Sequence, residues 1–200
     1  MAEIARYAIM ILAAGNSSRL GEPKQLLHYQ SKTLIRHVTE AAIAAESTGV
    51  FVITGSNASL IEKELDPLPY QPVYNPAWES GMASSIVAGV QQLVVMQPDS
   101  TGVIFAVSDQ PFVTTDLFNA LINKSLERGS CIVASAYQNT LGTPVLFSKN
   151  YFHSLLSLTG AEGAKKLITK FAADATSVPF PSGSIDIDTQ EDYQKLLGNG

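Results

Sequence analysis

Cysteine is almost missing from this sequence of 200 residues, where Cys131 is the only one. A single cysteine excludes an internal disulfide and argues against a zinc site built from cysteines. The apolar neighbours of Cys131 in CIVASA indicate a buried, inert thiol rather than a nucleophile. Histidine is also scarce. The three histidines are scattered singly, and we expect them to be structural or surface residues.

Long hydrophobic runs and an excess of basic residues are missing as well. No apolar run approaches the roughly 20 residues that span a bilayer, and the apolar start of the chain ends in glycine without a signal-peptide cleavage pattern. The 13 basic and 18 acidic residues give a net charge of -5, so no broad basic surface is available for nucleic acid or an anionic membrane. We therefore expect a cytoplasmic protein with small-molecule substrates, with neither a nucleic acid nor a membrane as partner.

What the sequence does contain is enough apolar residues, 46%, to bury one sizeable core. We expect a single domain over residues 1–200. Short apolar runs bounded by glycine, serine or aspartate predict buried parallel strands, at residues 7–13, 50–53, 102–107 and 131–136. Apolar residues at helical spacing predict helices between them, at residues 33–45, 84–95 and 115–128. Four prolines predict a loop over residues 66–76.

The alternation of strands and helices predicts the fold class. It is typical of an α/β protein, here a single-domain, Rossmann-like three-layer sandwich with a mainly parallel central sheet. In such sheets ligands bind beyond the carboxyl ends of the strands. Segments that directly follow a predicted strand are therefore the first candidates for a functional site.

The segment after the first strand, LAAGNSSRLGEPKQLL, has the composition of a phosphate-binding loop. Small residues let backbone N–H groups approach an anion, and the cations Arg19 and Lys24 neutralise a polyphosphate. The spacing excludes a Walker loop, because Lys24 lies three residues beyond Gly21, and a GxGxxG pattern is also absent. The alternative is a surface turn with two solvated cations. The position after a buried strand favours the ligand site.

Aspartates provide candidate ligands for Mg²⁺. Asp109 follows the strand at 102–107, at the edge of the sheet where the loop also lies, and Mg²⁺ is usually held by one or two carboxylates with phosphates and water. Such an aspartate is otherwise a turn or cap residue. Asp186 and Asp188 are two residues apart and would face the same side of an extended chain. Asp188 or Thr189 also fits a cap of the last helix.

The residues before the helix at 84–95 are candidates for nucleotide binding, because a helix N-terminus offers free N–H groups to an anion or a base edge. An exposed loop explains the same residues. Trp78, in this segment, fits equally well as an aromatic wall of a site and as an anchor of the loop in the core.

The run from Leu12 to Leu27 resembles the signature LAAGxSxRMGxxKQLL of the nucleotidyltransferases related to molybdenum cofactor biosynthesis, with Leu20 in place of methionine. The resemblance continues, in the order of the family, in NPAWESGMASSI, SDQP, GTPVLF and DIDTQEDY, and it covers essentially the whole chain. It implies the fold of the nucleotide-diphospho-sugar transferases and a Mg²⁺-dependent transfer of a nucleotidyl group.

The resemblance also implies roles for individual residues. Lys24, Arg19 and Asp109 are the expected catalytic residues, and Asp109 and Asp188 the expected ligands of Mg²⁺. Gly142, Thr143 and Pro144 resemble a GxP turn that shapes the acceptor side. The expected nucleotide-binding residues are Leu12, Ala13, Ala14, Gly15, Ser17, Ser18, Arg19, Lys24, Asn75, Gly81, Met82, Ser84, Ser85 and Ser108.

The second alanine of LAAG, Ala14, resembles the cytidylyl-transferring branch of the family, whereas the guanylyl branch looks like LAGG. This implies CTP as the donor, a molybdopterin-type cofactor as the acceptor, and transfer of the product to a molybdenum hydroxylase. The chain departs from the family in GAEGAK, where relatives carry GDxGAR, so that Ala161 replaces an acid and Lys165 an arginine. The alternatives are a cytidylyltransferase for another phosphorylated metabolite, a non-catalytic carrier of nucleotide or pterin cofactor, and an NAD-binding domain, which the missing GxGxxG disfavours.

Overall fold

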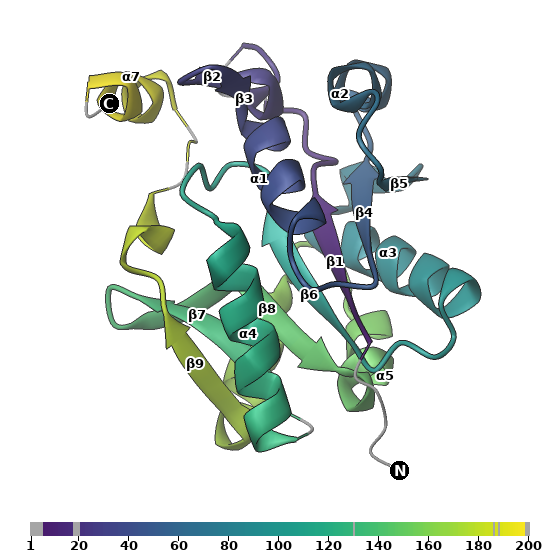
Figure 1. The fold of residues 1–200 in the computed structure, drawn as a ribbon. Coiled ribbons are helices and arrows are strands. Elements are labelled where there is room, and N and C mark those ends of the chain that lie inside the picture. The colour runs from purple at the N-terminus through teal and green to yellow at the C-terminus, as the bar shows by residue number, and fades with distance from the viewer. Residues whose placement is uncertain (1–5, 18–20, 130, 186, 188, 199–200) are drawn as a thin grey trace.

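A computed structural model describes residues 6–17, 21–129, 131–185, 187 and 189–198. Its centre is a seven-stranded sheet in the order β5-β4-β1-β6-β8-β7-β9 (Figure 1). The strands are β1 (Tyr7–Leu12), β4 (Gly49–Thr54), β5 (Gln71–Tyr74), β6 (Gly102–Val107), β7 (Ile132–Tyr137), β8 (Thr140–Ser148) and β9 (Ala175–Pro179). β8 runs antiparallel to its neighbours β6 and β7, whereas the other pairs are parallel. The predicted mainly parallel α/β fold is confirmed.

Helices cover both faces of the sheet (Figure 1). One face packs against α1 (Leu34–Ile43), α2 (Ala58–Leu65) and α4 (Thr115–Arg128). The other packs against α3 (Met82–Met96), α5 (Phe152–Leu156) and α6 (Ala164–Lys170). Successive side chains of β1 alternate between the two faces, since Ile9 and Ile11 belong to the first core and Ala8 and Met10 to the second. This alternation makes β1 the centre of the three layers.

A third, smaller apolar cluster holds the end of the chain. The hairpin of β2 (His28–Tyr29) and β3 (Lys32–Thr33) packs with α7 (Gln190–Gly198), and in Figure 1 the two lie side by side. The hydroxyl of Tyr193 donates a hydrogen bond of 2.8 Å to the carbonyl oxygen of His28. Ile187 and α7 are thereby held beside the residues that follow the glycine-rich loop.

Threonine caps set where the helices begin. Thr33 accepts a hydrogen bond from the backbone N–H of Arg36 and starts α1, and Thr114 accepts one from Leu117 and starts α4. α4 has the bounds that the sequence predicts and is followed by Gly129 in a left-handed conformation. Thr189 and Asp192 exchange the reciprocal bonds of a capping box at α7, so the predicted cap is confirmed for Thr189.

Two predictions about local structure are wrong. Residues 66–76 are not a loop throughout, because Gln71–Tyr74 forms β5 and pairs with β4. Pro72 is accommodated there because β5 is an edge strand. Gly142, Thr143 and Pro144 do not form a turn but belong to β8, whose apolar residues Val145, Leu146 and Phe147 are buried between β6 and β7. The predicted parallel strand at 131–136 is β7, which is parallel to β9 but antiparallel to β8.

Cys131 is buried, as predicted, and burial raises the pKa of its thiol. Among the helices that the structure describes, none combines the length and the hydropathy needed to cross a lipid bilayer.

Candidate active site

A buried glutamine holds the described parts of the glycine-rich loop, residues 13–17 and Lys24, together. Gln25 is 1% exposed, and its Nε2 donates hydrogen bonds to the carbonyl oxygens of Ala13 at 3.2 Å and Gly15 at 2.9 Å. Its Oε1 accepts a bond from the Ser17 hydroxyl, which in turn accepts one from the backbone N–H of Lys24. The loop is therefore closed on itself, with Lys24 at its downstream end. Sequence reasoning missed this role of Gln25, because nothing in KQLL distinguishes a buried glutamine from an exposed one.

Lys24 and Asp109 come together across the end of the sheet. The Nζ atom of Lys24 lies 2.5 Å from Oδ2 of Asp109, and the side chains are only 20% and 12% exposed. The other carboxylate oxygen, Oδ1, is buried without a hydrogen-bond partner in the described part of the chain. Two of the three predicted catalytic residues are thus adjacent. The third, Arg19, and its neighbour Ser18 lie outside the described residues.

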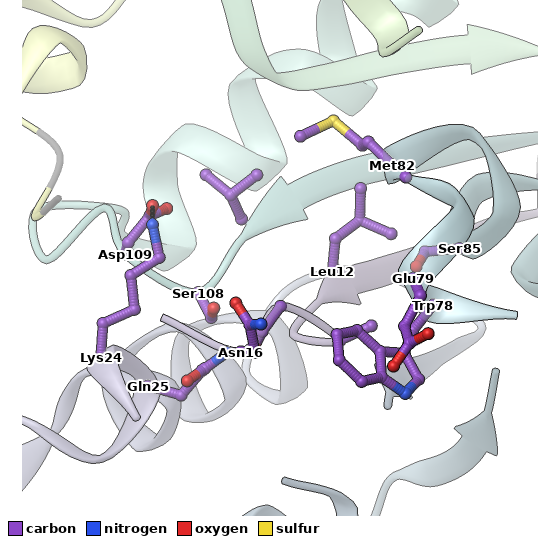
Figure 2. A pocket seen from close by; sticks show the side chains of 14 residues that line it. Leu12, Asn16, Lys24, Gln25, Trp78, Glu79, Met82, Ser85, Ser108 and Asp109 are labelled. Carbon is purple, nitrogen blue, oxygen red and sulfur yellow. Dashed lines mark hydrogen bonds and ion pairs between the residues drawn. The ribbon is translucent and has the colours of Figure 1, made fainter. Parts of the chain in front are cut away.

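A cavity of about 410 Å³ opens beside this ion pair. Figure 2 shows Lys24 and Asp109 at one end of it and Trp78 and Glu79 at the other. The predicted site residues that line it are Leu12, Ala14, Gly15, Lys24, Gly81, Met82, Ser85, Ser108 and Asp109. The cavity thus offers a charged end to a polyphosphate and an aromatic end to a base. Sequence reasoning missed four lining residues, Asn16, Gln25, Glu79 and Val107.

Of the two roles that the sequence left open for Trp78, the structure favours the wall of a cavity, because Trp78 is half-buried and belongs to none of the apolar core clusters. It lines the cavity, and it packs closely on Gly55, where an added Cβ would lie 2.7 Å from the Cβ of Trp78. Because Gly55 has no side chain, Trp78 can pack directly against the backbone that follows β4.

Four predicted nucleotide-binding residues, Ala13, Ser17, Asn75 and Ser84, are absent from the cavity lining. Asn75 is 2% exposed, and its Nδ2 donates to the hydroxyls of Ser84 and Ser85 at 2.8 and 3.0 Å. Its Oδ1 accepts a bond from the backbone N–H of Ala77. In the glycine-rich loop, the carbonyl oxygen of Ala13 accepts a hydrogen bond from Gln25, and the hydroxyl of Ser17 accepts one from the backbone N–H of Lys24. These residues hold the two loops in place, and the side chains beside them face the cavity.

The loop before α3 depends on Gly81. Its φ of +105° favours glycine, and a Cβ at this position would lie 2.4 Å from the carbonyl oxygen of Gly160. This close approach lets the backbone N–H of Ala83 donate a 3.2 Å hydrogen bond to the same oxygen. The start of α3 is therefore joined directly to the GAEGAK segment.

Replacing Gly81 by alanine is expected to lower the free energy of unfolding by about 1–3 kcal/mol and to weaken binding of the nucleotide that the sequence resemblance implies, because the loop must leave Gly160 to relieve strain and clash. Urea denaturation and calorimetric titration with CTP measure the two effects. Gly129→Ala is the matched control, since Gly129 also has a positive φ but no atom within 4 Å of an added Cβ. Equal destabilisation by the two variants, with CTP affinity unchanged, would contradict the role of the Gly81 contact.

A second cavity, of about 510 Å³, adjoins the first. Both are lined by the same five residues, Leu12, Lys24, Met82, Val107 and Asp109. Most of the remaining lining comes from β8 and the turn before it, from α6 and from residues 183–184, and it includes Gly142, Thr143 and Lys165. Pro144 is not part of this lining. The Lys24–Asp109 ion pair consequently stands between two neighbouring cavities, an arrangement suited to two substrates.

Gln110, next to Asp109, joins the walls of the second cavity. It is 4% exposed, and its Nε2 donates a 2.8 Å bond to the carbonyl oxygen of Gly183. Its Oε1 accepts a bond from the hydroxyl of Thr143 at 3.3 Å. Gln110 thereby fixes β8 and the segment before DIDT to the end of β6. Sequence reasoning missed this residue, because both of its partners are distant in the chain.

The described residues include one carboxylate oxygen that suits a divalent cation. The buried, unpartnered Oδ1 of Asp109 is an oxygen of the kind that Mg²⁺ prefers. The two candidates for a second carboxylate, Asp186 and Asp188, lie outside the described residues. Within the part of the chain that is described, no group of three or more histidine, cysteine or acidic side chains is gathered as a metal site. One or two carboxylates suffice where substrate phosphates complete the coordination, so Asp109 fits this ion.

Comparison with protein families gives one match over most of the chain. Residues 9–176 match the model of the MobA-like NTP transferase domain. Two similar curated proteins are the purine catabolism protein PucB of Bacillus subtilis and the nicotine blue oxidoreductase of Paenarthrobacter nicotinovorans. Both are 27% identical to this chain, and both alignments cover 94% of it. They cover 94% of PucB and 95% of the nicotine blue oxidoreductase. A probable molybdenum cofactor guanylyltransferase of Flavobacterium johnsoniae is 25% identical over 78% of this chain and 76% of its own.

Solved structures share the fold. Rv0371c of Mycobacterium tuberculosis superposes with a TM-score of 0.83 at 28% identity, over 97% of this chain and 98% of that one. A structure of Rv0371c described as a complex with manganese has a TM-score of 0.82 at 24% identity, over 98% and 100% of the two chains.

Proposed function

Because the chain belongs to the MobA-like NTP transferase domain family and is a nucleotidyltransferase, we propose that it transfers CMP from CTP to the phosphate of a molybdopterin-type cofactor, releasing pyrophosphate. The observation that carries this proposal is the Lys24–Asp109 ion pair on the wall shared by two cavities. Ala14 in LAAG supports CTP as the donor, and the guanylyltransferase relative supports a pterin cofactor as the acceptor. The product would pass to a molybdenum hydroxylase.

In the proposed reaction, an oxygen of the acceptor phosphate attacks the α-phosphorus of CTP. The bond from that phosphorus to the bridging oxygen breaks, and pyrophosphate leaves with the bonding electrons. A phosphate monoester carries about -1.5 to -2 charge near neutral pH, so the nucleophile needs no histidine base. The protein's task is alignment and charge stabilisation. Lys24 would donate to the triphosphate and to the departing pyrophosphate, with Arg19 in the same role.

The proposed cofactor is Mg²⁺, held by Asp109 through its free oxygen and by Asp188, or by Asp186 in its place. When bound, the ion neutralises phosphate charge and orients the phosphate oxygens. The manganese complex of Rv0371c supports a divalent cation in a protein of this fold. In the structure the ammonium group of Lys24 lies against the other oxygen of Asp109, where it balances the carboxylate charge.

The proposal is tested by pyrophosphate release from CTP, GTP, ATP and UTP in turn, with Mg²⁺ and the molybdopterin-type cofactor. We expect release with CTP at least about tenfold faster than with the other nucleotides, since one well-placed polar contact to a base contributes about 1–3 kcal/mol. Release with GTP alone would contradict the assignment of the donor. Release only with another phosphate monoester, such as a sugar phosphate, would assign the chain to cytidylyltransferases of other metabolites. Binding of both ligands without release would indicate a carrier.

A further inference from the structure

The first cavity, of about 410 Å³, carries an acidic side chain at the end away from the ion pair. Glu79 lines the cavity beside Trp78, and Figure 2 shows both at the opposite end from Lys24 and Asp109. Glu79 is exposed, and its side chain has no hydrogen bond or ion pair within the part of the chain that the structure describes. No described side chain therefore neutralises this carboxylate.

The backbone on each side of Glu79 is held by a close packing contact. Trp78 lies against Gly55, where an added Cβ would stand 2.7 Å from the Cβ of Trp78. Gly81 meets the turn before α6, where an added Cβ would lie 2.4 Å from a carbonyl oxygen. The short helix η2 (Trp78–Ser80) joins these two points, and the backbone N–H of Gly81 donates a 3.2 Å hydrogen bond to the carbonyl oxygen of Trp78. Glu79 therefore projects from a fixed turn at the end of the cavity.

The charges at the two ends of the cavity favour one direction of binding for a nucleoside triphosphate. Lys24 would attract the phosphates at one end, and the carboxylate of Glu79 would repel them at the other. The base would then lie at Trp78, because an indole ring offers a flat apolar surface for stacking. The ribose would lie between the base and the phosphates. The group within reach of Glu79 is therefore the edge of the base rather than the ribose hydroxyls.

A carboxylate distinguishes bases by the groups that they present to it. It only accepts hydrogen bonds, so it attracts an exocyclic amino group and repels a carbonyl oxygen. Cytosine and uracil have the same size but differ at C4, where cytosine carries an amino group and uracil a carbonyl oxygen. We propose that Glu79 selects the base of the donor nucleotide, by accepting a hydrogen bond from the amino group of cytosine and rejecting uracil. This inference rests on the proposed function and names a residue that sets its donor specificity.

The test compares Glu79→Gln with the control Glu46→Gln, which changes an exposed glutamate that lines neither of the two cavities. Calorimetric titration with CTP and with UTP, in the presence of Mg²⁺, measures the Kd values without any acceptor. The wild type and Glu46→Gln should bind CTP about tenfold or more tightly than UTP, since one polar contact to a base edge discriminates by about this factor. In Glu79→Gln the preference should fall to about twofold or less, because the amide also donates to the carbonyl oxygen of uracil.

Three results would overturn the role of Glu79. The first is equal binding of CTP and UTP by the wild type, and the second is a preference for CTP that Glu79→Gln retains in full. The third is an equal loss of affinity for both nucleotides in Glu79→Gln, which would assign the carboxylate to the ribose hydroxyls instead.

The same titrations separate this inference from the proposed function. If the wild type binds CTP but releases no pyrophosphate with the molybdopterin-type acceptor, the function fails, and the Kd values still decide the role of Glu79. If the wild type binds GTP in place of CTP, the assignment of the donor fails. Glu79 is then judged by GTP against ITP, which lacks the amino group of guanine, and a preference for GTP that Glu79→Gln loses supports it. A retained preference, or no binding of any nucleotide by the wild type, overturns it.

Discussion

Asp109→Ala is expected to lower kcat/KM for the proposed CMP transfer by about 10³-fold, the largest effect of any single substitution in the site. Asp109 contributes the carboxylate whose buried Oδ1 is free for a divalent cation, and it partners Lys24 through Oδ2. Removal takes away both the proposed metal ligand and the group that positions the ammonium. Pyrophosphate release under saturating Mg²⁺ measures the loss. Asp109→Asn should lose nearly as much activity, because the neutral amide keeps the shape of the carboxylate but not its charge.

Asp99→Ala is the control for Asp109, because the two aspartates lie at opposite ends of β6. Asp99 precedes the strand and pairs with Arg6 on the surface, where its side chain is 79% exposed. An exposed ion pair of this kind contributes little to stability, so the Asp99→Ala variant should fold and keep its activity. The melting temperature of each variant shows whether it is folded. A folded Asp109→Ala variant with wild-type turnover would contradict the proposed role of Asp109 in catalysis.

Lys24→Ala is expected to lower kcat by about 10²-fold and to raise the KM for CTP, because in the proposed reaction the lysine interacts with charge on the triphosphate and on the leaving pyrophosphate. Single-turnover and steady-state measurements of pyrophosphate release separate the two effects. Lys24→Arg keeps the charge but changes its geometry, and it should recover only part of the activity. Lys63→Ala removes an exposed lysine of α2 that lines neither cavity and should have no effect.

The double variant Lys24→Ala/Asp109→Ala provides a further check on Lys24. Because the two side chains are in direct contact, their effects should be clearly less than additive. Additive losses would show that Lys24 and Asp109 act independently, against the shared site proposed here.

Much of the fold follows from local sequence patterns. The apolar runs at β1, β4 and β6 and the helical spacing at α1, α3 and α4 are local properties, and the structure confirms each of these elements near its predicted bounds. The caps of α4 and α7 are equally local, since a threonine side chain bonds to a backbone group three residues away. The strands of the central sheet that sequence reasoning missed, β5, β8 and β9, gain their pairing from neighbours elsewhere in the chain.

By itself, the sequence determined the residue types of the site. The signature from Leu12 to Leu27 and the position of Asp109 after a strand placed Lys24 and the carboxylate at one edge of the sheet, and the structure brings them together. Only the tertiary structure decided which polar residues face a ligand and which support the loops. Lys24 and Asp109 are 85 residues apart, and Gln110 and Gly183 are 73. Which distant residues come into contact depends on the order of the strands in the sheet. This order depends on packing over the whole core rather than on any local pattern.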